Sequence, residues 1–88
     1  MTYEELQGAV EIFGLIGLEN KDQIKKKYLL LSKKYHPDTK DGSDKKFQEL
    51  TKAYQILNQY INSFKFRFTK EEFSNQYPLN SLDMKEYI

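Results

Sequence analysis

The chain has 88 residues, of which 39% are hydrophobic and 31% are charged, and its formal net charge is +1. A chain of this size forms one small domain and leaves little room for a deep active-site cleft. Cysteine is absent, which excludes disulfides, thiolate metal sites and a cysteine nucleophile. No apolar run approaches the roughly 20 residues of a membrane span, and the first ten residues are acidic where a secretory signal is basic. These features predict a soluble, cytoplasmic protein.

Residues 2–20 are predicted to form a first helix and a connection. Thr2 and Glu5 have the spacing of a capping box, and apolar residues then recur at helical intervals until Gly14. In the connection, Leu15, Ile16 and Leu18 are expected to fill the core. Asn20 is the expected cap of the next helix.

Two longer helices follow. The second is predicted over residues 21–35, because Pro37 disfavours helical backbone at the residue before it. The third starts after a cap at Ser43 or Asp44 and runs to about Ser63. Its apolar stripe repeats at intervals of three and four residues: Phe47, Leu50, Tyr54, Leu57, Ile61 and Phe64. The short loop between the two helices predicts an antiparallel hairpin with the first helix packed across it, which is an all-α fold.

The sequence changes character after this hairpin. The stretch "FKFRF" alternates aromatic and basic residues as an extended segment does. Thr69 and Glu72 have capping-box spacing and open a short helix that stops before Pro78. We therefore divide the chain into a helical core, residues 1–64, and a C-terminal extension, residues 65–88, packed on the core or trailing from it.

The tripeptide His36-Pro37-Asp38 contains the only histidine. An acid–base pair is conceivable, but the chain offers no cysteine and no phosphate-binding glycine loop to complete a catalytic site. A single imidazole with carboxylates at irregular spacing also lacks the ligand pattern of zinc. We therefore expect no enzyme activity, no cofactor and no metal. A plain helix terminus and a partner contact remain as interpretations.

Charge is unevenly distributed around this tripeptide. Residues 1–20 carry four glutamates and no base, whereas residues 21–35 carry six lysines and one aspartate. A helical wheel places Lys25, Lys26 and Lys33 opposite the apolar stripe of their helix, with Lys34 at the margin. The near-neutral total therefore hides a local basic field that selects acidic partners.

Three stretches together resemble the J-domain family, the DnaJ-like co-chaperones: "EIFGL", "QIKKKYLLLSKKYHPD" and "KFQELTKAYQIL". The resemblance spans about Val10 to Leu57. It implies an antiparallel hairpin of helices II and III, with a short helix I across it, and a DnaK-type heat shock protein 70 partner whose ATP hydrolysis is stimulated. Carried over by position, the implied contacts are His36, Pro37, Asp38, Lys25, Lys26, Lys33 and Lys34. We expect a monomer with no nucleic-acid or membrane partner.

The chain departs from this family in two places. Leu29 and Leu30 lie among the lysines of the second helix, where many J-domains have Lys or Arg. Either the aromatic tail covers the two leucines, or they form an apolar addition to the chaperone-binding surface. The family's fourth helix is replaced by the aromatic extended segment and the short C-terminal helix.

Two other functions are compatible with parts of the sequence. A J-like module could dock to another protein without activating a chaperone, although the intact His-Pro-Asp argues against this. The lysines and "FKFRF" could bind nucleic acid by stacking bases, but the acidic first helix gives a poor electrostatic footprint.

Overall fold

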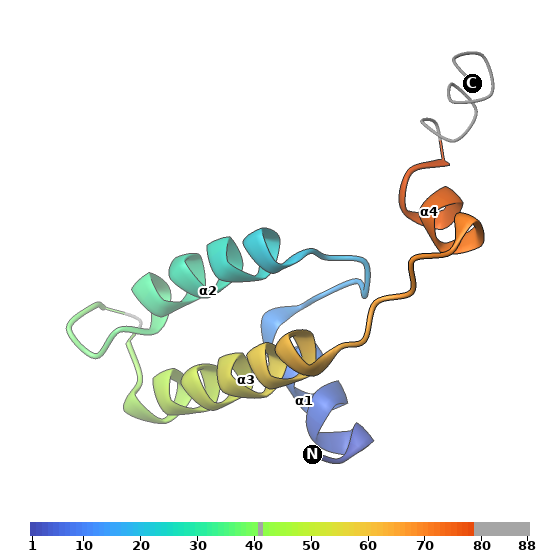
Figure 1. Cartoon of the computed structure of the whole chain (residues 1–88). Helices are drawn as coiled ribbons and strands as arrows, with labels where there is room; N and C mark the ends of the chain where they lie inside the picture. The colour runs from blue at the N-terminus through green and yellow to red at the C-terminus, as the bar shows by residue number, and fades with distance from the viewer. Residues whose placement is uncertain (41, 79–88) are drawn as a thin grey trace.

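The computed structural model describes residues 1–40 and 42–78, and this part of the chain is all-α. Its helices are α1 (Tyr3–Phe13), α2 (Lys21–Tyr35), α3 (Asp44–Ser63) and α4 (Lys70–Gln76). The long helices α2 and α3 run antiparallel, and α1 packs mainly against α3 (Figure 1). The predicted fold class and the helix II/III hairpin are confirmed. In the described residues, no helix is both long and apolar enough to cross a bilayer.

The helices begin where the sequence predicted. In each case the N-cap side chain accepts the backbone N–H three residues further on, and the caps are Thr2, Asn20, Ser43 and Thr69. Asn20 and Gln23 form a complete capping box, with bonds of 2.8 and 2.7 Å. Helix α1 ends at Gly14, whose φ of 63° is left-handed backbone that glycine adopts without strain.

The core joins α1, α2 and α3. Its buried residues are Ala9, Phe13, Ile24, Leu50, Ala53 and Leu57. Beside them, the rings of Tyr28 and Tyr54 stack with centroids 4.1 Å apart, and the ring of Phe13 lies 6.1 Å from that of Tyr54. Each of these three rings comes from a different helix, so the aromatic stack fixes α1 across the hairpin.

The predicted role of the first connection was wrong in part. Leu15 is half-buried against the core, but Ile16 and Leu18 are 84% and 88% exposed. The carboxylate of Glu19 accepts the backbone N–H groups of Ile16, at 2.7 Å, and of Gly17, at 2.9 Å. This turn, with a φ of 100° at Gly17, directs the two apolar side chains into solvent.

The apolar stripe of the third helix also ends earlier than predicted. Phe64 is the C-cap of α3 and is half exposed. From there the chain leaves the hairpin, and α4 makes no contact with the other three helices (Figure 1). The Nζ of Lys21 donates to the side-chain oxygen of Asn62 at 3.5 Å, so the start of α2 and the end of α3 lie together. The α2–α3 loop occupies the opposite end of the hairpin.

Candidate functional site

The tripeptide lies at the tip of the hairpin, in the loop between α2 and α3. His36 has a ψ of 136°, which takes the chain out of the helix just before Pro37. The carbonyl of Tyr35 accepts the N–H of Ser43 at 3.2 Å, so the two ends of the loop are joined by a backbone hydrogen bond. The tripeptide is therefore part of a closed loop and not of a free strand.

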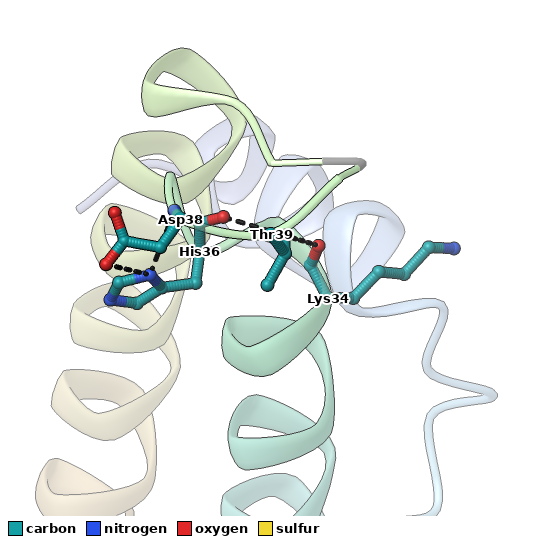
Figure 2. A network of polar contacts seen from close by, with 4 residues as sticks. All are labelled: Lys34, His36, Asp38 and Thr39. Atoms are coloured by element: carbon teal, nitrogen blue, oxygen red, sulfur yellow. Dashed lines mark hydrogen bonds and ion pairs between the residues drawn. The ribbon is translucent and has the colours of Figure 1, made fainter.

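Thr39 links the two ends of this turn through the hydrogen bonds drawn in Figure 2. Its hydroxyl donates to the carbonyl of Lys34, at 3.0 Å, and to that of His36, at 2.8 Å. Its backbone N–H also donates to the His36 carbonyl, at 2.9 Å. The hydroxyl has one proton, so its two bonds share a single donor. Thr39 thus ties the last turn of α2 to the turn that presents the tripeptide.

The His36 ring is positioned from two sides. Its edge meets the ring of Phe47 on α3, with centroids 5.8 Å apart and planes at 79°. The backbone N–H of Asp38 donates to His36 Nδ1 at 3.2 Å, which requires a free lone pair on that nitrogen. The Asp38 carboxylate lies 3.6 Å from the same atom, a contact that becomes an ion pair only when Nδ1 carries a proton. Nδ1 cannot serve both interactions at once; Figure 2 draws both contacts, of which the hydrogen bond from the Asp38 N–H is the shorter.

The other two residues of the tripeptide face solvent. The Asp38 side chain is 91% exposed, and the 3.6 Å contact is its sole polar contact within the described residues. Pro37 is exposed beside it. His36 is half exposed and contacts both Phe47 and the backbone of Asp38, while the Asp38 oxygens can accept hydrogen bonds from another molecule.

Gly42 completes the loop by close approach. Its N–H donates to the carbonyl of Thr39 at 3.0 Å. A Cβ added here would overlap the carbonyl oxygen of His36 and lie 3.0 Å from that of Thr39. Because both obstacles are backbone atoms, a side chain at this position forces the loop to change shape.

We predict that Gly42→Ala lowers the free energy of unfolding by more than about 1 kcal/mol. Gly8→Ala is the matched control, since a Cβ at Gly8 meets nothing within 4 Å and the residue lies inside α1. It should raise stability by about 0.5–1 kcal/mol. Urea unfolding followed by circular dichroism measures both. Equal effects of the two substitutions would contradict this view of the loop.

The basic side chains predicted as contacts lie along α2 below the loop. All four are exposed: Lys25, Lys26, Lys33 and Lys34. Lys34 Nζ lies 5.5 Å above the Tyr35 ring, whereas Lys25, Lys26 and Lys33 have no ion pair or hydrogen bond to any described side chain. The apolar stripe of the same helix is buried or half-buried. The predicted separation of a core face from a basic face is confirmed.

A shallow recess connects the basic face to the loop. It has a volume of about 360 Å³ and is lined by Tyr28, Ser32, Lys33, His36, Thr39 and Phe47. Within the described residues, no group of three or more His, Asp or Glu side chains could hold a metal ion. The geometry is that of a contact surface, with an exposed carboxylate at the end of a basic helix.

Comparison with known proteins decides the family. The sequence model of the DnaJ domain matches residues 8–62, which include the second half of α1, all of α2 and nearly all of α3. The chain belongs to the DnaJ domain family. This J-domain includes the His-Pro-Asp loop and the lysines of α2. J-domains are non-enzymatic modules, which confirms the prediction that this domain is not an enzyme.

The similar proteins include the "Chaperone protein DnaJ" of Staphylococcus epidermidis and that of Staphylococcus aureus, each 48% identical over 50 residues. The aligned segment is 54% of this chain and 13% of each relative, so the J-domain corresponds to a small part of those proteins. No solved structure matches the chain significantly.

The two leucines of α2 are open to solvent in this J-domain. Leu29 is 48% exposed and Leu30 is 67% exposed. The described part of the tail leaves the hairpin at the opposite end from the loop and does not cover them (Figure 1). Residues 79–88, which belong to the predicted extension, lie outside the described residues. The basic face of this J-domain therefore has an apolar centre.

Sequence reasoning missed three residues of the site. The sequence marks Thr39 and Gly42 only as residues of the short polar loop, although each fixes the backbone of the tripeptide. A glycine in a short loop signals close backbone approach, and this could have identified Gly42. Lys46 of α3 was also missed, and its Nζ lies 5.4 Å above the Tyr35 ring. It adds a cation next to the loop.

Proposed function

We propose that residues 1–64 bind the ATP form of a DnaK-type heat shock protein 70 and stimulate its ATP hydrolysis, with residues 65–88 as an extension. The observation that carries the proposal is the exposed Asp38 carboxylate, held by a closed loop at the tip of a lysine-rich helix. The family assignment supports a heat shock protein 70 partner in general. We expect the partner to be a cytoplasmic chaperone.

The lysines of α2 perform the first step, which is attraction. Lys25, Lys26 and Lys33 have no acidic side chain within the described residues to neutralise them, so their field extends into solvent. An acidic surface on the chaperone is drawn to this face and oriented by it. Leu29 and Leu30 then add apolar contact area at the centre of the same face.

The loop performs the second step. Pro37 and the hydrogen bonds of Thr39 limit the conformations that the loop loses on binding, so less of the binding free energy is spent on ordering it. The Asp38 carboxylate accepts charge-assisted hydrogen bonds from an arginine of the chaperone. As in the J-domain family, this contact weakens interdomain interactions that restrain hydrolysis. The chemistry takes place in the chaperone.

Single-turnover ATP hydrolysis by a DnaK-type chaperone, with increasing amounts of the chain, tests the proposal. We expect saturable stimulation. The double substitution Lys25→Ala/Lys26→Ala should raise the half-saturating concentration by about threefold to tenfold, since each exposed charge pair contributes about 0.2–1 kcal/mol. The effect should shrink between about 50 and 500 mM salt, because exposed charges are screened.

The matched control is Lys52→Ala/Lys65→Ala, which removes two exposed lysines outside α2. It changes the net charge equally and should leave the half-saturating concentration within about twofold, as expected for surface changes away from a contact. Equal effects of the two double variants would show that only total charge matters. Binding without stimulation would favour a docking module that activates no chaperone.

A further inference from the structure

The tail carries a surface that the chaperone contact does not use. Phe66 and Phe68 are 70% and 96% exposed, and Phe64, Phe73 and Tyr77 are also exposed. Together with basic side chains they line a groove of about 1190 Å³, called here the tail groove. Contiguous exposed aromatic surface of this kind marks an interaction site in a soluble protein. The tail groove lies at the end of the hairpin remote from His36 (Figure 1).

The backbone between α3 and α4 makes few hydrogen bonds within the described chain. The N–H of Phe64 donates to Ile61, and the carbonyl of Thr69 accepts from Phe73. Between them, residues 65–68 make no backbone hydrogen bond within the described chain. Phe64 and Thr69 both have extended φ and ψ angles. Such a segment presents the same free donors and acceptors as the edge strand of a sheet.

Aromatic and basic residues alternate along the segment. In extended backbone, Phe64, Phe66 and Phe68 point to one side and Lys65 and Arg67 to the other. The rings of Phe64 and Phe66 are in contact, with centroids 5.7 Å apart, as expected for residues on the same side. Neither Lys65 nor Arg67 has an ion pair to a described residue. An extended backbone would therefore place the aromatic side chains on one side and two cations, unneutralised within the described residues, on the other.

We propose that residues 64–69 bind an extended peptide segment of a partner protein, by strand pairing, when that segment alternates apolar and acidic residues. Its backbone would pair with the free N–H and C=O groups. Its apolar side chains would lie on the phenylalanines, and its carboxylates opposite Lys65 and Arg67 as favourable cross-strand pairs. This binding site goes beyond the proposed function and does not depend on it.

The same observations disfavour other occupants. A second copy of the segment, paired antiparallel about Phe66, would set Lys65 opposite Arg67, and like charges in that position are destabilising. A bilayer would leave the backbone groups of residues 65–68 without partners, which costs several kcal/mol for each group in hydrocarbon. Single-stranded nucleic acid could stack on the rings, but it would not use the free backbone groups and would meet Glu71 and Glu72 at the start of α4.

Fluorescence anisotropy with the whole chain tests the proposal without a chaperone. The probe is a labelled peptide of alternating Val and Glu, compared with an alternating Val and Lys peptide and with a Val and Glu peptide N-methylated at alternate residues. We expect the first to bind at least about tenfold more tightly than the other two, because only it offers both the charges and the backbone donors.

Two variants locate the binding. Phe66→Ser/Phe68→Ser should weaken binding at least about tenfold, since both rings are lost from the apolar side. Ile16→Ser/Leu18→Ser is the matched control, because these residues are equally exposed but lie outside the tail groove. Lys65→Glu/Arg67→Glu should reverse the preference toward the Val and Lys peptide. Circular dichroism checks that each variant keeps its helices.

Several results would overturn the inference. One is equal binding of the acidic, basic and N-methylated peptides, and another is no loss in the phenylalanine variant. Tighter binding to oligothymidine, or to vesicles of phosphatidylcholine and phosphatidylserine, would assign the tail groove to a different partner. Concentration-dependent dimerisation lost in Phe66→Ser/Phe68→Ser would assign it to a second copy. A failure to stimulate a chaperone would contradict the proposed function, but it would not bear on the binding of the peptide.

Discussion

Replacing Asp38 by asparagine is expected to remove most of the stimulation of ATP hydrolysis in a DnaK-type chaperone. The side chain keeps its size, and the backbone N–H that bonds to His36 is unaffected. What is lost is the charge of the carboxylate, and charge-assisted hydrogen bonds contribute about 1.5–3 kcal/mol. That free energy corresponds to a loss of stimulation of at least about tenfold when the chain is present at a subsaturating concentration. Single-turnover hydrolysis measures it.

The fold should not respond to the same substitution. The Asp38 side chain is 91% exposed, so the thermal unfolding of Asp38→Asn should match that of the unaltered chain. Asp22→Asn is the matched control, because it removes the same charge from an exposed residue at the other end of α2. The control should stimulate normally. Equal stimulation by the unaltered chain and by Asp38→Asn would reject the assigned role of this carboxylate.

Replacing Leu50 by alanine is expected to cause a large loss of stability. Leu50 is fully buried in α3, at 0% exposure, within the core that joins α1 to the hairpin. Removing a buried leucine side chain costs about 2–5 kcal/mol, from lost transfer free energy and the cavity that remains. Small domains are stable by only about 5–15 kcal/mol, so a substantial fraction of the folding free energy should disappear. Urea unfolding followed by far-ultraviolet circular dichroism measures it.

Leu30→Ala makes the same chemical change on the surface. Leu30 is 67% exposed, so the free energy of unfolding should change by no more than about 0.5 kcal/mol. This variant also tests the proposed apolar contact, because it should weaken chaperone stimulation while leaving stability intact. If Leu30→Ala and Leu50→Ala destabilised the chain equally, the division between core and surface would be wrong.

Helix boundaries were predictable because their signals are local. Asn20 and Gln23 lie within one turn, and the cap forms as soon as that turn does. Pro37 ends α2 through a steric effect on its immediate neighbour. The aromatic stack was only partly predictable. The spacing placed Tyr54 toward the core, but its direct stacking on Tyr28 depends on the hairpin register, and periodicity does not encode that register.

The errors concern residues whose surroundings are set by backbone turns. Ile16 and Leu18 are as hydrophobic as core residues, but the Glu19 carboxylate binds two N–H groups and turns them outward. In the sequence Thr39 resembles any polar loop residue, but in the structure its hydroxyl donates to the His36 carbonyl. Ala53 is a different case, because it lies inside α3: it is 2% exposed, but its small side chain adds little to an apolar stripe. The tripeptide was found because its composition and order are distinctive. Thr39 and Gly42, which fix its backbone, carry no such distinctive pattern.

The antiparallel hairpin has a geometric consequence for the two ends of the chain. Helix α2 has 15 residues, so it separates the His-Pro-Asp tip from the start of the tail by about 22 Å. A peptide captured in the tail groove would be tethered at that distance from the chaperone and could not occupy the surface that the loop needs. Such tethering raises the local concentration of a captured segment to the order of millimolar. The domain would then keep a captured segment close to a bound chaperone but away from the chaperone contact.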